Sequence, residues 1–453
     1  MSATPSQQGP SDMIQTQHAP QPQLDSPIHG LQSASIASPF NRVPVELVFL
    51  ILCHIHPKRV LRFRRVCKTL NQILTSNAFA FANLRFHLPD ELRNHRKFKN
   101  LKNQDRHDSE RSLQELWLLL PETYQRTFAN YIRPHMSQLR VMGLESFSRH
   151  DGSREPFRIR LSPSLAHFQN LSTLCLKRVS IEGAIPEEIS LLLRLETLQL
   201  SECDLSGRIP PQLSQLSRLK ELHLRSNRLE GCIPPELGKL ERMQLLDLSN
   251  NHFSGTLPEE LGNLENLEVL RIEKNKELTG PIPSSFGNLW RLVNLSLRGN
   301  QLSGSIPAEL MFLSRLNALN LSGNRLTGAI PLEMGLLSHL QWLMLNDNLL
   351  EGNIPGSLGD IELLRTLDLR GNRLEGHLPI ELGRLMFLRV LDVRDNRVSG
   401  RIPKQFGAMR CLVALHVSGN KKLCGIVPKG IRATVQYRDR MSMFFRFRIV
   451  NMD

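Results

Sequence analysis

The chain has few of the features that mark secreted, membrane-spanning or metal-binding proteins. Its seven cysteines form an odd number and show no metal-ligand spacing. It contains no run of about 18 apolar residues, the length that predicts a transmembrane helix. The first 40 residues are rich in Gln, Ser and Pro and lack the apolar core and basic leader of a secretion signal. These absences predict a cytoplasmic or nuclear protein with reduced cysteines and no membrane contact.

Groups of residues that could catalyse a reaction are also missing. No Gly-rich loop has phosphate-binding spacing, because the glycines recur with the repeat described below. His54 and His56 lie near Cys53 in the sequence, but they stand at the end of an amphipathic helical pattern. Cys67 belongs to an apolar stripe of the next helical pattern. The sequence therefore predicts a protein that is not an enzyme and that needs no cofactor or metal.

The positive charge of the chain is unevenly distributed. The formal net charge is +14, yet residues 161–430 hold 30 Lys and Arg against 28 Asp and Glu, whereas residues 41–160 hold 22 against 11. A nearly neutral segment offers little counterion release, so nucleic acid binding by residues 161–430 is not expected. The charged run at residues 85–112 is typical of a solvated loop. A basic contact for nucleic acid or for an acidic protein is the alternative interpretation of that run.

A repeat of nearly constant length is the dominant feature that is present. The pattern Gly-x-(Ile or Leu)-Pro occurs ten times between Gly183 and Gly400, almost always 24 residues apart. Each copy follows a segment of the form LxxLxLxxNxL, such as residues 219–229. A period of about 20 to 29 residues with this leucine spacing predicts a leucine-rich repeat solenoid. The predicted fold class is an α/β repeat, a right-handed solenoid of about eleven repeats, whose sheet is on the order of 50 Å long.

A column of asparagines accompanies the repeat. Its members are Asn227, Asn251, Asn275, Asn300, Asn324, Asn348, Asn372, Asn396 and Asn420. A buried amide can satisfy backbone groups that would otherwise lack hydrogen-bond partners, so we expect a structural role. Cys203 and Val179 occupy the same position in the two preceding units, which indicates that the column fades toward a cap. One interval is 25 residues long, and Glu277 is the predicted extra residue, absorbed in a loop.

The Gly-x-Ile-Pro segments resemble one subclass of leucine-rich repeat, common in plant receptor-like proteins. The resemblance covers about residues 165–430 and rests on ten matches in register. It implies a second short strand in each repeat and a superhelical twist of the solenoid.

Residues 39–84 carry three short apolar stripes at helical spacing. Pro44 fits the first turn of the first predicted helix, where a missing N–H group has no cost. Three short helices in about 45 residues are too small to build an independent core. Their apolar faces therefore need a cover, either from another protein or from an adjoining segment.

This helical segment resembles an F-box. The matching residues are Val43, Pro44, Val45, Glu46, Leu47, Ile51, Leu52, Ile55, Pro57, Leu61, Val66, Cys67, Lys68 and Leu70. The match departs from the family at Val43, where Leu is usual, and at His56, where an acidic residue more often precedes the proline. The resemblance implies docking on the adaptor subunit of cullin-RING ubiquitin ligases. The docking residues carried over are Pro44, Leu47, Ile51, Ile55, Leu61 and Val66. The alternative is that these side chains pack on the linker and on the first repeat.

The predicted layout has five parts. They are a disordered tail (1–38), the F-box-like segment (39–84), a charged linker with a helical N-terminal cap (85–160), the leucine-rich repeat solenoid (161–430) and a C-terminal capping tail (431–453). Within the linker and cap, residues 113–142 predict helix. In the tail, residues 444–450 alternate in the manner of a strand and could cover the end of the solenoid.

Variable strand positions predict a binding surface on the concave face of the solenoid. Trp342 and Met344 are expected on exposed positions of one strand, with charged residues one and two repeats further on. An aromatic anchor with a charged rim resembles the centre of a protein interface. The candidate partner-binding residues are Trp342, Met344, Asp368, Arg370, Asp392 and Arg394. The alternative is that Asp and Arg pair across adjacent strands and only stabilise the sheet.

Together these patterns predict a non-catalytic protein-recognition module. The leading hypothesis is a substrate-recognition subunit of an F-box type cullin-RING ligase, in which the repeat domain holds a protein target near the ubiquitin donor. The rival hypothesis is an interaction scaffold unrelated to ubiquitylation. A third hypothesis, a secreted or surface recognition protein, has only the repeat subclass in its favour.

Overall fold

The computed structural model describes two separate units of the chain. The described residues are 52, 80, 124–125, 138–142, 159–424, 427–428 and 434–436. In the first unit (Met1–His87) these are Leu52 and Ala80, which are helical and buried. The second unit (Leu88–Asp453) contains the repeats. Within the described ranges, no helix is both long enough and apolar enough to cross a membrane.

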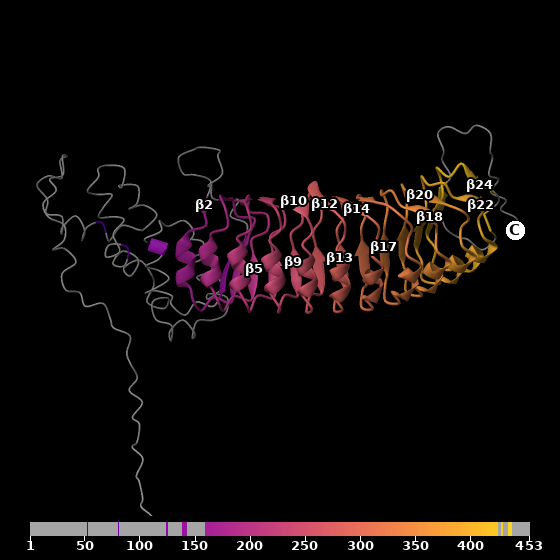
Figure 1. Ribbon diagram of the computed structural model, residues 1–453. Coiled ribbons are helices and arrows are strands. Elements are labelled where there is room, and N and C mark those ends of the chain that lie inside the picture. Colours follow the sequence, from indigo (N-terminus) through magenta and orange to yellow (C-terminus); the bar gives the residue numbers. More distant parts are fainter. Residues whose placement is uncertain are drawn as a thin grey trace, which may run out of the picture. The chain divides into compact units, whose positions relative to one another are not determined.

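The second unit is built on one parallel sheet of 13 strands that lie in sequence order, which we call the main sheet (Figure 1). Its strands are β1 (Gln138–Met142), β3 (Thr173–Lys177), β5 (Thr197–Gln199), β7 (Glu221–His223), β9 (Leu245–Asp247), β11 (Val269–Arg271), β13 (Asn294–Ser296), β15 (Ala318–Asn320), β17 (Trp342–Met344), β19 (Thr366–Asp368), β21 (Val390–Asp392), β23 (Ala414–His416) and β25 (Thr434–Gln436). The eleven strands from β3 to β23 correspond to the eleven predicted repeats. The leucine-rich repeat solenoid is confirmed.

The leucine spacing explains the strand register. Leu246 pairs with Leu270, and Leu270 pairs with Leu295, so equivalent leucines align from repeat to repeat. Because side chains alternate across a strand, the central leucine points into the solenoid while its neighbours point away from it. All three of these leucines are fully buried. Each repeat thus needs its neighbours to complete the core.

A second set of short strands follows the asparagine column, as the repeat subclass implied. One six-stranded sheet contains β6 (Ser206–Gly207), β8 (Arg228–Gly231), β10 (His252–Thr256), β12 (Glu277–Gly280), β14 (Gln301–Gly304) and β16 (Arg325–Leu326). Three two-stranded sheets pair β2 (Ile159–Arg160) with β4 (Ile181–Glu182), β18 (Glu351–Asn353) with β20 (Arg373–Glu375), and β22 (Ser399–Arg401) with β24 (Lys422–Cys424). The motif glycine is required for its backbone conformation: Gly280 has φ +81, and a Cβ there would lie 2.7 Å from Thr256 Cγ2.

A short 3-10 helix follows the motif proline in each of the ten motif copies, one more precedes the first copy, and neighbouring helices pack on one another. These helices are η5 (Pro163–His167), η6 (Glu187–Leu191), η7 (Pro211–Gln215), η8 (Pro235–Lys239), η9 (Glu259–Asn263), η10 (Ser284–Asn288), η11 (Ala308–Phe312), η12 (Leu332–Leu336), η13 (Gly356–Asp360), η14 (Ile380–Arg384) and η15 (Lys404–Ala408). The helices come very close to one another, since a Cβ on Gly262 would lie 2.4 Å from Ser285 O. Glycine at this position therefore permits the close stacking of η9 on η10.

The asparagine column is a buried hydrogen-bond ladder, as predicted. All nine members are buried. In a typical step, Asn251 Nδ2 donates to Leu224 O at 3.0 Å, and Asn251 Oδ1 accepts from Leu229 N at 3.1 Å. Cys203 takes the same position one repeat before Asn227, and its thiol donates to Leu176 O at 3.0 Å. The ladder joins each repeat to the one before it.

Three predictions about irregular segments have different outcomes. Helix was predicted for residues 113–142, but Gln138–Met142 form β1, which pairs in parallel with β3 and extends the main sheet by one strand. That part of the prediction is wrong because an open sheet edge offers backbone partners that outweigh local helical preference. The predicted strand at residues 444–450 lies outside the described residues. Glu277, the predicted extra residue, is the first residue of β12 and not part of a loop as expected, and the next residue closes a turn in which Leu278 N donates to Asn275 O at 3.0 Å.

Candidate functional site

The outward face of the main sheet brings together the residues that were predicted to bind a partner. Trp342 and Met344 lie on β17 with the buried Leu343 between them, so both side chains are on the same face. Trp342 is 37% exposed, and Met344 is half-buried. In the sheet register Met344 pairs with Asp368, and Asp368 pairs with Asp392. The apolar pair and the two carboxylates therefore occupy consecutive strands.

Asp392 is neutralised by groups of this chain. Arg394 Nε donates to Asp392 Oδ1 at 2.9 Å, and His416 Nδ1 lies 3.3 Å from Asp392 Oδ2. Burial alone would raise the pKa of Asp392, but the hydrogen bonds from Arg394 and His416 hold the pKa below its ordinary value. The Asp392–Arg394 pair is thus a partly buried ion pair whose charges satisfy each other.

Arg370 points to a residue that sequence reasoning did not select. Its Nη2 donates to Asp347 Oδ2 at 3.0 Å, and Asp347 also accepts from Asn346 Nδ2 at 2.8 Å. The alternative interpretation, in which Asp and Arg pair across adjacent strands of the sheet, is therefore wrong about the partners of both arginines. Arg394 pairs with Asp392 of its own repeat, and Arg370 pairs with Asp347 in the loop of the repeat before.

These pairings leave Asp368 as the acid with spare hydrogen-bonding capacity. Among the described residues, its carboxylate accepts only from the backbone N–H of Arg370, at 3.1 Å. Burial raises the pKa of Asp368 above its ordinary value, and the negative charge of Asp392 adds to that rise. A half-buried carboxylate of this kind can accept hydrogen bonds from an arriving partner at little further desolvation cost.

We expect removal of these two charges to change stability in opposite directions. Since its pKa is raised in the folded state, ionised Asp368 disfavours folding at neutral pH. Asp368→Asn should therefore match or exceed the stability of the unchanged protein near neutral pH, and the gain should vanish in acid. Since the pKa of Asp392 is lowered, Asp392→Asn should cost about 1–3 kcal/mol near neutral pH. That cost should shrink as pH falls through the folded-state pKa. Urea unfolding at several pH values measures both effects, and two changes of the same sign would contradict the assignment.

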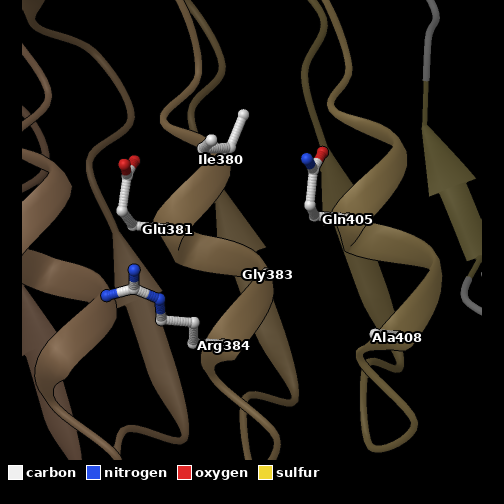
Figure 2. Close-up of a pocket in the computed structure, with 6 residues that line it drawn as sticks. All are labelled: Ile380, Glu381, Gly383, Arg384, Gln405 and Ala408. Atoms are coloured by element: carbon white, nitrogen blue, oxygen red, sulfur yellow. The ribbon is translucent and has the colours of Figure 1, made fainter.

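The row of 3-10 helices contains a separate hollow between η14 and η15. Figure 2 shows its six lining residues, Ile380, Glu381, Gly383, Arg384, Gln405 and Ala408, which enclose about 340 Å³. Arg384 turns away from it toward η13, where its Nη1 donates to Asp360 Oδ1 at 3.0 Å. None of the predicted site residues lines it. Across the parts of the chain that are described, no group of three or more His, Cys, Asp or Glu residues is arranged to hold a metal ion.

Comparison with protein families identifies both parts of the chain. The F-box domain family model matches residues 40–81. Leucine rich repeat models match residues 194–216, 218–240, 242–264, 265–326, 363–385 and 387–409. The chain is an F-box and leucine-rich repeat protein. Both kinds of domain are non-catalytic interaction modules, so this F-box and leucine-rich repeat protein is a protein-interaction module.

Several solved structures that are similar to this F-box and leucine-rich repeat protein are receptors. A TDR receptor is 32% identical with a TM-score of 0.60, over 69% of this chain and 55% of that chain. The plant peptide hormone receptor RGFR1 in complex with RGF2 is 30% identical with a TM-score of 0.57, over 66% and 55%. The Arabidopsis receptor kinase HAESA ectodomain with an extended IDA peptide hormone is 29% identical with a TM-score of 0.52, over 65% and 51%. The chain spans about half the length of these structures. No curated protein matches the sequence.

The structure describes one of the two sets of predicted site residues and not the other. Pro44, Leu47, Ile51, Ile55, Leu61 and Val66 lie outside the described residues, although the F-box match contains all six positions. The six sheet-face residues lie on three consecutive strands of the main sheet or, for Arg370 and Arg394, two residues beyond a strand end. The sequence did not predict the pairing of Asp347 with Arg370 or of His416 with Asp392, because both depend on side-chain direction. The sequence does contain one signal for them, since each is a hydrogen-bonding residue about one repeat away from its partner.

Proposed function

We propose that this protein is the substrate-recognition subunit of an F-box type cullin-RING ubiquitin ligase. The observation that carries the proposal is the combination of an F-box match at residues 40–81 with a long repeat domain on the same chain. The F-box segment binds the ligase adaptor through Pro44, Leu47, Ile51, Ile55, Leu61 and Val66. The chain supplies no chemistry itself, and it raises the effective concentration of target lysines near the ubiquitin donor. Such a protein works in the cytoplasm or the nucleus.

The target binds the outward face of the main sheet in this proposal. Trp342 and Met344 supply apolar contact area, and Asp368 supplies a hydrogen-bond acceptor without a side-chain partner among the described residues. Arg370 and the Asp392–Arg394 pair form a charged rim whose geometry is already set within the chain. Aromatic and arginine residues are the commonest sources of binding energy in protein interfaces. Two of the similar structures are in complex with peptide hormones, which supports a peptide or protein ligand for a repeat domain of this kind.

Co-purification with the purified ligase adaptor tests the proposal. The full chain should retain the adaptor, and Leu47→Asp with Ile51→Asp should reduce retention at least tenfold, because a buried carboxylate without a partner costs several kcal/mol. A matched control replaces two exposed leucines of η12, Leu332→Asp with Leu336→Asp, and should retain the adaptor fully. A second pair, Trp342→Ala with Arg370→Ala, should lose the target while the adaptor stays bound.

The rival hypothesis of a scaffold unrelated to ubiquitylation has a different outcome. A scaffold would not retain the adaptor even at high protein concentration, yet it would still lose its target with the Trp342 and Arg370 changes. Adaptor retention that survives the Leu47 and Ile51 changes would also contradict the docking residues named above.

A further inference from the structure

One edge of the solenoid carries exposed apolar side chains that the fold does not require. This edge consists of the turns that link each 3-10 helix to the next main-sheet strand, and we call it the turn edge. The last three turns of this edge within the described residues are 361–365, 385–389 and 409–413. Four large apolar side chains are exposed there: Leu363 at 40%, Met386 at 44%, Phe387 at 55% and Val413 at 62%. These four residues are the apolar turn cluster.

Other turns of the same edge show that the repeat is stable with polar residues at these positions. The turn at residues 216–220 places Ser217, Arg218 and Lys220 there, and the turn at residues 240–244 places Glu241, Arg242 and Gln244 there. Elsewhere on this edge, exposed apolar residues occur at Leu193 and at Trp290 with Val293, and polar turns flank each of those places. Each of the last three described turns carries at least one exposed large apolar side chain, and the core does not explain this succession. Exposed apolar surface without a structural reason is typical of a binding site.

The three turns form a continuous surface. Arg389 N donates to Arg365 O, and Val413 N donates to Arg389 O, both at 2.8 Å, so equivalent positions follow one another across the repeats. At a strand spacing of about 4.8 Å the three turns span about 10 Å, the rise of roughly two turns of an α-helix. Arg365 N also donates to Gln341 O at 2.8 Å, which places this surface directly beside Trp342.

The charge of the surface indicates the chemistry of the partner. Arg365, Arg389 and Arg410 are exposed, and across the described part of the chain none of their side chains has a hydrogen bond or an ion pair. Glu362 is the acid on these three turns. Unpaired arginines around an apolar centre favour carboxylates, which they bind in a bidentate manner. A lipid surface fits less well, because membrane-binding clusters hold about four to eight Lys or Arg.

We propose that the last three turns of the turn edge bind an acidic amphipathic segment of a partner protein. Its apolar side chains pack on the apolar turn cluster, and its Asp or Glu side chains pair with Arg365, Arg389 and Arg410. The surface extends the sheet-face site around the edge of the solenoid. It does not depend on the ligase role, since it requires only that the repeat domain is an interaction module.

A displayed library of random peptides of about 16 residues, roughly four helical turns, tests this inference on the full chain. We expect selected peptides to combine Leu, Phe or Trp with Asp or Glu. A synthetic copy of a selected peptide should bind at least tenfold more weakly to Met386→Ser with Phe387→Ser, and to Arg365→Glu with Arg389→Glu. A copy of the peptide whose Asp and Glu are replaced by Lys should bind the variant with Arg365→Glu and Arg389→Glu more tightly than it binds the unchanged protein. The matched control is Arg218→Glu with Arg242→Glu, which reverses two exposed charges on earlier turns of the same edge, at the positions equivalent to Leu363 and Phe387, and should leave binding unchanged.

Four results would overturn the inference. The first is that no peptide is selected, and the second is that the selected peptides lack acidic residues. The third is that the control variant weakens peptide binding as much as the turn-edge variants do. The fourth is that the unchanged protein is a dimer and the turn-edge variants are monomers. Vesicles of phosphatidylserine provide a further comparison. The surface would be assigned to a membrane instead if the full chain bound no peptide, sedimented with these vesicles, and lost that sedimentation when Arg365 and Arg389 were changed. All variants should keep the unfolding midpoint of the unchanged protein, because every altered side chain is exposed.

Discussion

Asn324→Ala should lower the free energy of unfolding by about 2–4 kcal/mol, because three buried hydrogen bonds are lost together. Leu302 N loses its side-chain acceptor, although Leu297 O and Leu321 O keep second donors on neighbouring asparagines. Asn324 Nδ2 donates to Leu297 O at 3.0 Å and to Leu321 O at 2.9 Å. Asn324 Oδ1 accepts from Leu302 N at 3.1 Å. Alanine can make none of these bonds, and the site is in the packed interior. Urea unfolding followed by circular dichroism measures the change.

The control for this change is another asparagine of the same domain. Asn263 ends η9 and is exposed, so Asn263→Ala should change the free energy of unfolding by less than about 0.5 kcal/mol. Equal effects of the two changes would show that Asn324 has no special role in joining repeats. A large effect confined to Asn324 would support the ladder as the main polar connection between repeats.

Phe286→Ala should be about as damaging, at about 3–5 kcal/mol, because it removes a large side chain from a site that cannot collapse fully. Phe286 lies in η10 and is fully buried. Leucine occupies the equivalent position in the preceding helix, at Leu261, so Phe286→Leu should cost less than about 1.5 kcal/mol. Thermal and urea unfolding of the three proteins measure this order.

A second phenylalanine provides the matched comparison for that prediction. Phe312 ends η11 and is 71% exposed. Phe312→Ala should leave the free energy of unfolding within about 0.5 kcal/mol of the unchanged protein. If Phe312→Ala destabilised the protein as much as Phe286→Ala, the inward and outward positions of the 3-10 helices would be assigned wrongly.

The contrast between these residues explains how the repeat domain can evolve binding surfaces. Core leucines, the asparagine ladder and the close-approach glycines carry the stability of each repeat. The outward positions of strands and turns carry little of it, so they are free to change. Trp342 and the apolar turn cluster both occupy such outward positions. Binding residues can therefore accumulate there without weakening the stack of repeats.

Much of the architecture could be predicted from the sequence, because a repeated local pattern has one way to bury its leucines. The strand positions, the eleven repeats and the buried asparagine column all follow from a spacing of about 24 residues. The F-box was recognisable from the residues around Pro44. The strand β1 was not predicted, because its partner is the open edge of a sheet formed by residues more than 30 positions away. Local helical preference is a weak guide where such an edge is available.

The sequence by itself determined which residues face outward on the main sheet, since a strand alternates its side chains between two faces. Only the tertiary structure decided how the charges among them are paired. Arg370 could have paired with Asp368 or with Asp347, and the side-chain geometry selects Asp347. The same is true of the turn edge, where Leu363, Phe387 and Val413 become neighbours only when successive repeats stack. Contacts between repeats depend on distances in space, and the order of residues along the chain does not contain those distances.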